Sequence, residues 1–164
     1  TTQHQGAQTQ HQTARFFCKA GGKLYWHTRF KIVDTFDKAN IFLGMGTLDT
    51  AILTTGALAV TDFIGFTIST AGAGALKCRS CKGGVAQSDT ALTIAEDTFV
   101  DLAIVVDGVS EIQFWVNNVR KTLTNIVAAT HIPVGALYPA FGCETDGTND
   151  PIMHVQGFQV LQSY

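Results

Sequence analysis

Charged residues are scarce in this sequence, and their scarcity narrows the choice of partner. Asp, Glu, Lys and Arg make up 15% of the 164 residues, and the formal net charge is −2. A protein that holds a nucleic-acid backbone needs a field of basic side chains, so we expect no nucleic-acid partner. No apolar run approaches the roughly 18 residues of a membrane-spanning helix, and no signal-peptide pattern opens the chain. We therefore expect a soluble protein without a membrane partner.

Metal-binding patterns are also missing. The chain has four cysteines, of which only Cys78 and Cys81, in "CRSC", have the spacing of zinc ligands. Neither a second close pair nor a histidine pair accompanies them, and on a strand they would point to opposite faces. We predict that these two thiols, with Cys18 and Cys143, are free and half-buried in a reducing compartment, with no metal or other cofactor bound.

Catalytic patterns are absent as well. Glycosidases on β-sandwiches place carboxylates at alternating positions of one strand, as in E-x-D-x-E, and no such strand occurs here. Glu96, Glu111 and Glu144 each lie beside a turn and are expected to be solvated, and no serine has a G-x-S-x-G context. The acidic loop 144–151, "ETDGTNDP", offers oxygen ligands for Ca²⁺ but has the composition of an ordinary solvent loop. We assign no catalytic residue and expect no enzyme.

Apolar residues at every second position are what the sequence does contain, and this is the period of a half-buried strand. The stretch 23–32, "KLYWHTRFKI", alternates in this way, and residues 62–70, 98–108 and 111–117 repeat the pattern. The Asp107–Gly108 turn joins the last two stretches into a hairpin. The residues predicted to face the core are Leu24, Trp26, Thr28, Phe30, Ile32, Ile64, Phe66, Ile68, Leu102, Ile104, Val106, Ile112, Phe114 and Val116.

Helical periodicity is weak, with at most a short helical turn expected within residues 34–40 or 125–131. Many short strands separated by glycine-rich turns predict an all-β chain. The expected architecture is an antiparallel two-sheet β-sandwich of the jelly-roll type. The last stretch, 152–162, also alternates, but its pattern leaves open which of its faces is inward.

The first thirteen residues, "TTQHQGAQTQHQT", are rich in glutamine and have no apolar period. We predict a polar N-terminal arm over residues 1–13 and a single domain over residues 14–164. An arm of this composition is expected to be mobile, since it cannot offset the entropy lost on ordering. The alternative is that it becomes ordered by lying on a neighbouring chain.

The order of these motifs is similar to that of a known family. "LYWHTRFKI" is followed by "DFIGFTIS", a glycine turn, "DTFVDLAIVVDGVSEIQFWVNNVR" and a closing "VQGFQVLQ". From Phe16 to Gln162 the chain resembles the concanavalin A-like jelly roll of virion structural proteins from tailed bacteriophages, especially capsid decoration proteins.

The resemblance implies a structural role on the outer surface of a phage capsid. Its partner would be the major capsid protein, whose lattice it would stabilise by binding only the assembled form. It would also associate with itself, with a trimer as the candidate homo-oligomer. The expected location is the outer capsid surface of the virion, after synthesis in the host cytoplasm.

A glycan-binding module of a phage tail fibre or surface appendage is the alternative function. Flat aromatic rings stack on sugars, and Tyr25 and Trp115 are predicted to point away from the core. The candidate interface residues are Gln5, Gln8 and Gln10 in the arm, together with Tyr25 and Trp115.

Overall fold

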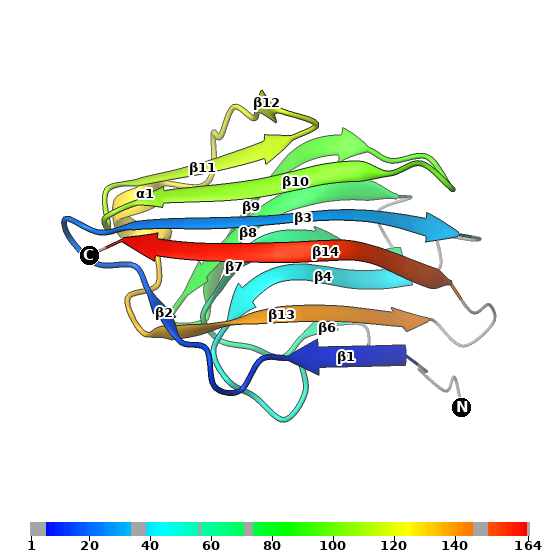
Figure 1. Cartoon of the computed structure of the whole chain (residues 1–164), viewed down its shortest axis with the longest axis horizontal. Coiled ribbons are helices and arrows are strands. Elements are labelled where there is room, and N and C mark those ends of the chain that lie inside the picture. Colours follow the sequence, from blue (N-terminus) through cyan, green and yellow to red (C-terminus); the bar gives the residue numbers. More distant parts are fainter. Residues whose placement is uncertain (1–5, 34–38, 56, 71–73, 146–150, 164) are drawn as a thin grey trace.

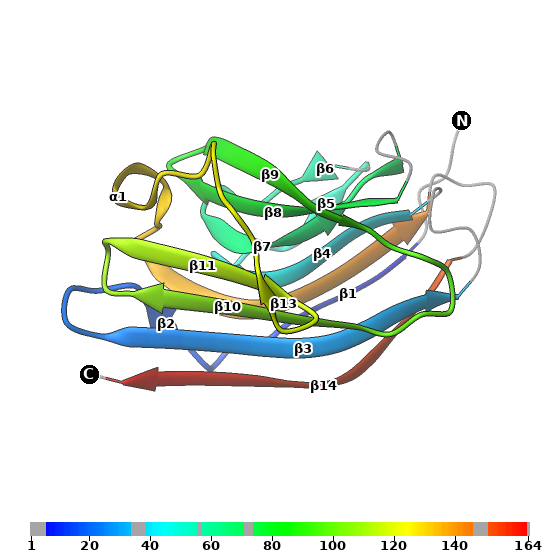
Figure 2. The ribbon, with the colours of Figure 1, turned by 90° about the horizontal axis from the view of Figure 1, so that it is seen from above.

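The computed structural model describes residues 6–33, 39–55, 57–70, 74–145 and 151–163. Two antiparallel sheets face one another across a common core, as Figures 1 and 2 show from two directions. The predicted all-β, two-sheet sandwich is confirmed. One short helix, α1 (Ala128–His131), lies within one of the two stretches where a helical turn was expected. Among the described residues, no helix has the length and apolar character needed to cross a membrane.

The larger sheet has seven strands. Its main path runs in the order β1 (Gly6–Gln10), β13 (Ala136–Thr145), β4 (Ala39–Gly46), β7 (Phe63–Ile68), β8 (Ala75–Lys82) and β9 (Val85–Thr93). The two-residue strand β2 (Phe16–Phe17) pairs with the start of β13.

The smaller sheet has five strands, in the order β12 (Val119–Arg120), β11 (Glu111–Val116), β10 (Val100–Asp107), β3 (Lys23–Val33) and β14 (Ile152–Ser163). Trp26 lies opposite Ile104, which in turn lies opposite Phe114, so the predicted inward residues share one face. The predicted hairpin turn contains Gly108 with a φ of 62°, a backbone conformation that favours glycine.

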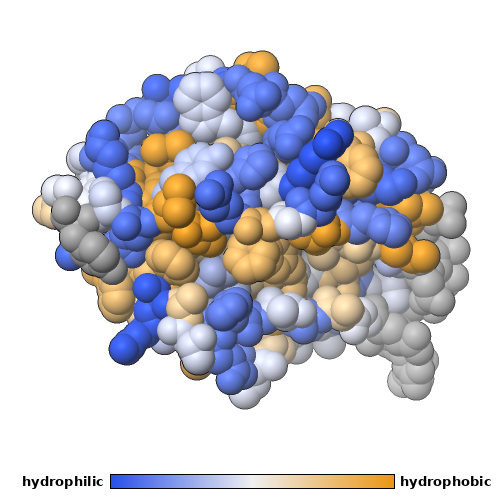
Figure 3. Space-filling view, in the orientation of Figure 1, coloured by the Kyte–Doolittle hydropathy of each residue, from blue (hydrophilic) through white to orange (hydrophobic). Residues whose placement is uncertain are grey.

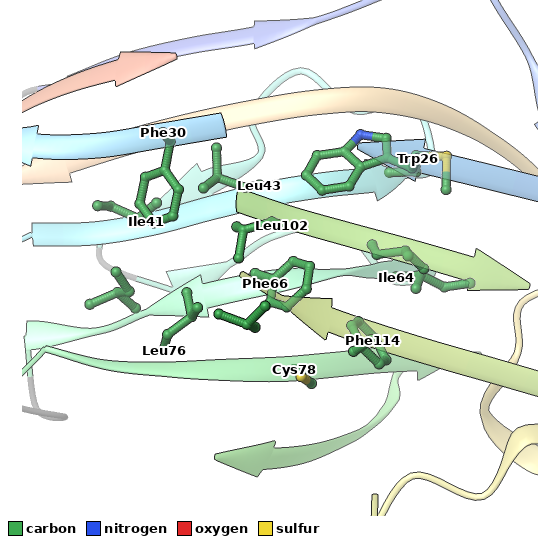
Figure 4. Close-up of a cluster of buried hydrophobic side chains, with 14 of the residues drawn as sticks. Trp26, Phe30, Ile41, Leu43, Ile64, Phe66, Leu76, Cys78, Leu102 and Phe114 are labelled. Carbon is green, nitrogen blue, oxygen red and sulfur yellow. The ribbon is translucent and has the colours of Figure 1, made fainter. Parts of the chain in front are cut away.

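The core between the sheets is dense and aromatic (Figure 4). All the residues predicted to face the core are buried. The Phe66 ring, from the seven-stranded sheet, meets the Phe114 ring of the five-stranded sheet edge-on, with 5.2 Å between centroids, and lies 6.3 Å from the Trp26 ring. Burying each such side chain contributes about 1.5–3 kcal/mol, so the inward face of every strand is strongly specified.

The outer face of the seven-stranded sheet is partly covered by a segment that strand periodicity does not predict. Residues 47–55 and 57–62, here called the cover, include the small hairpin of β5 (Leu53–Thr54) and β6 (Ala57–Leu58), and Figure 2 shows this hairpin outside the sheet. Apolar side chains of the cover pack on outward side chains of the sheet. The buried members of this second cluster are Phe42, Ile52, Leu53, Val60, Phe63, Cys81 and Ala140.

Part of the predicted N-terminal arm belongs to the sandwich. Gly6–Gln10 form β1, which pairs with β13 from Gly6 opposite Glu144 to Gln10 opposite Ala140. The domain therefore begins before residue 14, where the sequence analysis placed its start. An edge strand is held by backbone hydrogen bonds on one side and needs no apolar period of its own, so the composition gave no sign of it.

A β-bulge in β14 explains why its inward face was ambiguous. The register against β3 shifts between Val155 and Phe158, and Gly157 has a φ of 67°. Val155 lies opposite the inward Phe30, and Phe158 lies opposite the inward Thr28. Inward positions are therefore odd-numbered before the bulge and even-numbered after it, so no single alternation describes the whole strand.

Candidate functional site

A groove of about 640 Å³ lies on the outer face of the seven-stranded sheet, between the cover and strands β7 to β9. The cover forms one wall, with Leu58 and Ala59, and Phe63 and Thr67 of β7 lie beneath it. The side of the groove away from the cover carries Lys77 and Arg79 of β8 and Ser88 of β9. The groove thus combines apolar, hydroxyl and cationic groups.

Strand alternation places the two cations in the groove. In β8, Leu76, Cys78 and Ser80 are buried on the inner side, so Lys77 and Arg79 face outward, where they are half-buried. Lys77 lies opposite Thr67 of β7, and Arg79 lies between Gly65 of β7 and Ser88 of β9. The stretch 75–82, "ALKCRSCK", carries this alternation, but only its two cysteines were considered as candidate ligands.

One hydrogen-bond donor of the Arg79 side chain is buried and has no acceptor among the described residues. Its Nε atom is buried and makes no hydrogen bond with the described residues, although its guanidinium carbon lies 5.5 Å from the centroid of the Phe63 ring. Burial lowers the pKa of Arg79 below its usual value, and the nearby Cys81 acts in the opposite direction. The group starts so far above neutrality that it remains a cation.

The groove is cationic overall. No hydrogen bond or ion pair joins Lys77 to any described residue, and the described lining residues include no Asp or Glu. Neutral polar groups complete it at the end near β4, where the buried Asn40 accepts a hydrogen bond from the Thr70 backbone N–H at 3.2 Å. An anion entering the groove would meet two positive groups and no carboxylate among the described lining residues.

The glutamines predicted as interface residues fasten the cover to the sheet. The Oε1 atom of Gln8 accepts hydrogen bonds from the N–H groups of Ile52 and Leu53 at 2.6 and 2.9 Å, and its Nε2 donates to the Leu53 carbonyl at 2.8 Å. Gln10 donates to the Thr47 carbonyl at 2.8 Å and accepts from the Asp49 N–H at 3.0 Å. Their role toward another protein stays a prediction, and Gln5 lies outside the described residues.

Tyr25 and Trp115 lie on the opposite side of the molecule from the groove. Both are half-buried on the outer face of the five-stranded sheet, on strands β3 and β11 with β10 between them. Tyr25 stacks on His27 with 6.3 Å between ring centroids, and the Nε1 of Trp115 donates to Gln113 at 3.2 Å. The structure does not bring these aromatics together with Lys77 and Arg79.

The four cysteines are free and more deeply buried than predicted. As expected for a strand, Cys78 and Cys81 point to opposite faces, and they belong to the two different apolar clusters. Burial raises the pKa of Cys18 to about 12, and Cys78 reaches about 12 for the same main reason. Within the described part of the chain, no group of three His, Cys, Asp or Glu side chains is placed to hold a metal ion.

One carboxylate on β9 ties the loop before α1 to the sheet. Asp89, 8% exposed, accepts a 2.7 Å hydrogen bond from the Thr124 hydroxyl and further bonds from the N–H groups of Asn125 and Ile126. Burial opposes its ionisation, but these hydrogen bonds outweigh that effect and hold the pKa of Asp89 below its usual value. The loop is therefore held against β9.

The predicted solvated state of Glu144 is wrong. Its residue is 6% exposed, because it lies within β13 between β1 and β4 rather than in a loop. The other residues proposed as Ca²⁺ ligands in the 144–151 loop, Asp146, Asn149 and Asp150, lie outside the described residues.

Comparison with known proteins gives a clear answer on the fold. No protein-family model and no curated protein matches this sequence. Among solved structures, a legume lectin-like domain from Entamoeba histolytica matches with a TM-score of 0.69 at 11% identity, over 96% of this chain and 79% of that one. The carbohydrate recognition domain of Emp47p matches with a TM-score of 0.68 at 12% identity, over 99% and 81%.

Polysaccharide-cleaving enzymes share the same architecture. The alginate lyase AlyC3, in complex with dimannuronate, matches with a TM-score of 0.60 at 11% identity, over 90% of this chain and 66% of that one. Identities this low establish the fold and not the activity. This chain has the concanavalin A-like jelly-roll fold that its motif order implied.

Proposed function

We propose that this chain is a carbohydrate-binding domain and that the groove takes an acidic saccharide. The observation that carries the proposal is the pair Lys77 and Arg79, two cations without a described acidic partner in a groove lined by no described Asp or Glu. A carboxylate or sulfate on a sugar would accept hydrogen bonds from the terminal N–H groups of the half-buried Arg79 guanidinium, whose Nε is already desolvated. The groove volume of about 640 Å³ also falls within the range of small-ligand sites.

Each kind of group in the groove has a part in the proposed recognition. The planar guanidinium of Arg79 suits bidentate contact with a carboxylate, whereas Lys77 acts as a point charge. The Ser88 hydroxyl and the Asn40 amide suit sugar hydroxyl groups, and Leu58 and Phe63 offer apolar surface to the face of a ring. The fold is in keeping with this role, since it also occurs in a carbohydrate recognition domain and in a lyase bound to dimannuronate.

The proposal is for binding and not for cleavage. Glycoside hydrolysis needs an acid and a second carboxylate across the scissile bond. The described residues that line this groove include no Asp, Glu, His or Tyr, so the groups at hand are suited to holding a ligand.

Calorimetric titration with acidic and neutral tetrasaccharides tests the proposal. Tetramannuronate, tetragalacturonate and a sulfated tetrasaccharide are compared with neutral cellotetraose. We expect at least one acidic sugar to bind and the neutral sugar to bind much more weakly. Arg79→Gln should weaken acidic binding about 10- to 100-fold, the effect of losing a hydrogen bond between charged groups.

Arg29→Gln is the matched control, because Arg29 lies on the other sheet and is already 3.8 Å from Asp101. Its affinity should equal that of the unaltered chain, and denaturant unfolding should show that both variants are folded. Equal affinities for Arg79→Gln and the unaltered chain, or no binding of any acidic sugar, would remove the proposal.

Attachment to a phage capsid is the second candidate function and stays a prediction. The observation that favours a protein partner is the apolar, exposed strand β14, on which Ile152, Phe158 and Leu161 are 54%, 45% and 55% exposed. Quantitative mass spectrometry of purified particles would measure the copy number relative to the major coat protein. A fixed ratio of order one supports attachment to the capsid, and absence from particles rejects it.

A further inference from the structure

One side of the sandwich is bounded by two edge strands that do not pair with each other. These are β1 of the seven-stranded sheet and β14 of the five-stranded sheet. At one end of this side, the Gln162 side chain links the sheets, because it exchanges hydrogen bonds of 2.9 and 3.1 Å with the backbone of Phe17 in β2. Beyond that link, a cavity of about 320 Å³, here called the slot, lies between β14 and the strands β1 and β13.

The slot exists because the two edge strands carry side chains of unequal size. On β14, Val155 and Phe158 point inward, yet they remain 37% and 45% exposed. Facing them, β1 presents the small residues Ala7 and Thr9, of which Thr9 lies opposite Phe141 of β13. Side chains this small do not fill the gap, so apolar surface that points into the sandwich stays in contact with water. Figure 3 shows apolar side chains gathered in a band over β14.

The lining of the slot is mostly apolar, with a polar group at one end. Pro139 and Phe141 form its β13 side, and Met153 lies on its β14 side. The ring centroid of Phe158 is 5.1 Å from that of Phe141. His11 lies at the end beside Pro139, whose carbonyl accepts a 2.9 Å hydrogen bond from the His11 backbone N–H. The described residues that line the slot include no Asp, Glu, Lys or Arg, so His11 is their one ionisable group.

The dimensions of the slot restrict what can fill it. From Ala7 to His11 an extended strand advances about 13 Å, and about 320 Å³ over that length leaves a cross-section of about 25 Å². Carbon atoms pack at about 3.5–4 Å from one another, so this section admits a single unbranched chain and not a fused-ring system. An extended alkyl chain advances about 1.3 Å per carbon, so about ten carbons match the length of the slot.

We propose that the slot binds the alkyl chain of a fatty acid of about ten carbons, with the carboxylate at His11. The chain would cover the exposed inward surfaces of Val155 and Phe158, and each methylene removed from water favours binding. The His11 ring can donate a hydrogen bond to the carboxylate, whereas an alkylammonium ion would find no described carboxylate in the lining. The slot lies between the sheets and the groove lies on an outer face, so this inference does not depend on what the groove holds.

A series of straight-chain carboxylates tests the length and width of the slot. Calorimetric titration with hexanoate, octanoate, decanoate and dodecanoate is made below their micelle concentrations. Affinity should rise about fourfold per methylene up to decanoate and level off beyond it. Adamantane-1-carboxylate, which has a similar number of carbons but is too wide, and decylammonium, which has the opposite charge, should both bind much more weakly than decanoate.

Ala7→Leu tests the location, because the added carbons enter the slot. Decanoate affinity should fall about 10- to 100-fold, and the urea midpoint should not fall. Ala20→Leu is the matched control, since Ala20 is exposed in the turn between β2 and β3 and does not line the slot. Leu161→Ala controls for adsorption to the outer face of β14, where Leu161 is 55% exposed. Both controls should bind decanoate as the unaltered chain does.

Three results would overturn the proposal. The first is the absence of saturable binding of every carboxylate in the series to the unaltered chain. The second is equal decanoate affinity in Ala7→Leu and the unaltered chain. The third is equal affinity for decanoate and adamantane-1-carboxylate, because adsorption to an open apolar surface does not discriminate between a chain and a cage.

Discussion

The outer faces of the two sheets differ in whether their cationic side chains have carboxylate partners. On the five-stranded sheet, cations sit beside carboxylates: Lys31 lies 2.9 Å from Asp97, and Arg120 lies 2.7 Å from Glu111. On the seven-stranded sheet, Lys77 and Arg79 have no such partner among the described residues, and the Nε of Arg79 is buried. Paired charges on the surface contribute little to the free energy of unfolding. An unpaired and partly desolvated cation, in contrast, gains free energy when it binds an anion. The difference is the reason why the groove, and not the more heavily charged face, is proposed as the binding surface.

The largest expected effect comes from removing the aromatic support under the groove. Phe42 is fully buried beneath the cover, and its ring meets that of Phe63 edge-on at 5.7 Å. Phe42→Ala should lower the free energy of unfolding by about 3–5 kcal/mol, through lost burial and the cavity left behind. Urea denaturation measures this loss.

Trp115→Ala, on the half-buried outer face of the five-stranded sheet, is the companion to that measurement. Its loss should be about 1 kcal/mol, because this ring is only half-buried. Equal losses for the two variants would show that the cover does not shelter a second core.

An intermediate effect is expected at Asp89, whose charge is held by hydrogen bonds rather than by a cation. Asp89→Asn should cost about 1–3 kcal/mol of stability at neutral pH, since the donors of Thr124 and the backbone lose an ionised acceptor. The folded pKa lies below the unfolded value of about 3.9, so the stabilisation is present above that value and is lost as the pH falls through the folded pKa.

Urea midpoints for Asp89→Asn and the unaltered chain should therefore converge in acid. Asp107→Asn is the control, because Asp107 is 47% exposed in its contact with Lys23, and it should have little effect at any pH. A gap that widens as the pH falls would contradict the inferred direction of the Asp89 shift.

The smallest effect is expected on the paired face. Arg120→Gln breaks the 2.7 Å contact with Glu111, but both side chains are about half exposed, so stability should change by less than about 1 kcal/mol. Affinity for an acidic tetrasaccharide, measured by the titration described above, should not change. Weaker binding in this variant would move the site to the five-stranded sheet.

Inward residues were predicted best from the sequence where a strand has one solvent-exposed face and one buried face. The alternation in β3, β10 and β11 identified the inward residues correctly, because burial of one face fixes the period and the register. It worked less well where strands are covered on both sides. Every residue of β7 is buried, since the cover lies over its outer face. The alternation of apolar residues along a strand reports one buried face and does not indicate that a second layer covers the other.

The candidate site was missed for a related reason. In the sequence, Lys77 and Arg79 have the pattern of ordinary outward residues of a strand. They line a groove only because the cover packs beside them on the outer face of the sheet. Gln8 and Gln10 were recognised as unusual, but their partners lie 37 to 45 residues away along the chain. Contacts at such separation leave no trace in composition or spacing.

The sequence by itself determined that the chain is an all-β sandwich, which strands face its core, and where its best-defined hairpin turns, because these depend on local alternation and on glycine at a positive φ. Tertiary structure alone decided which cations lack partners, that the cover walls a groove, and that β14 is left as an open edge. These properties depend on which distant segments lie side by side. The alternation of apolar and polar residues along one strand carries no information about its distant neighbours.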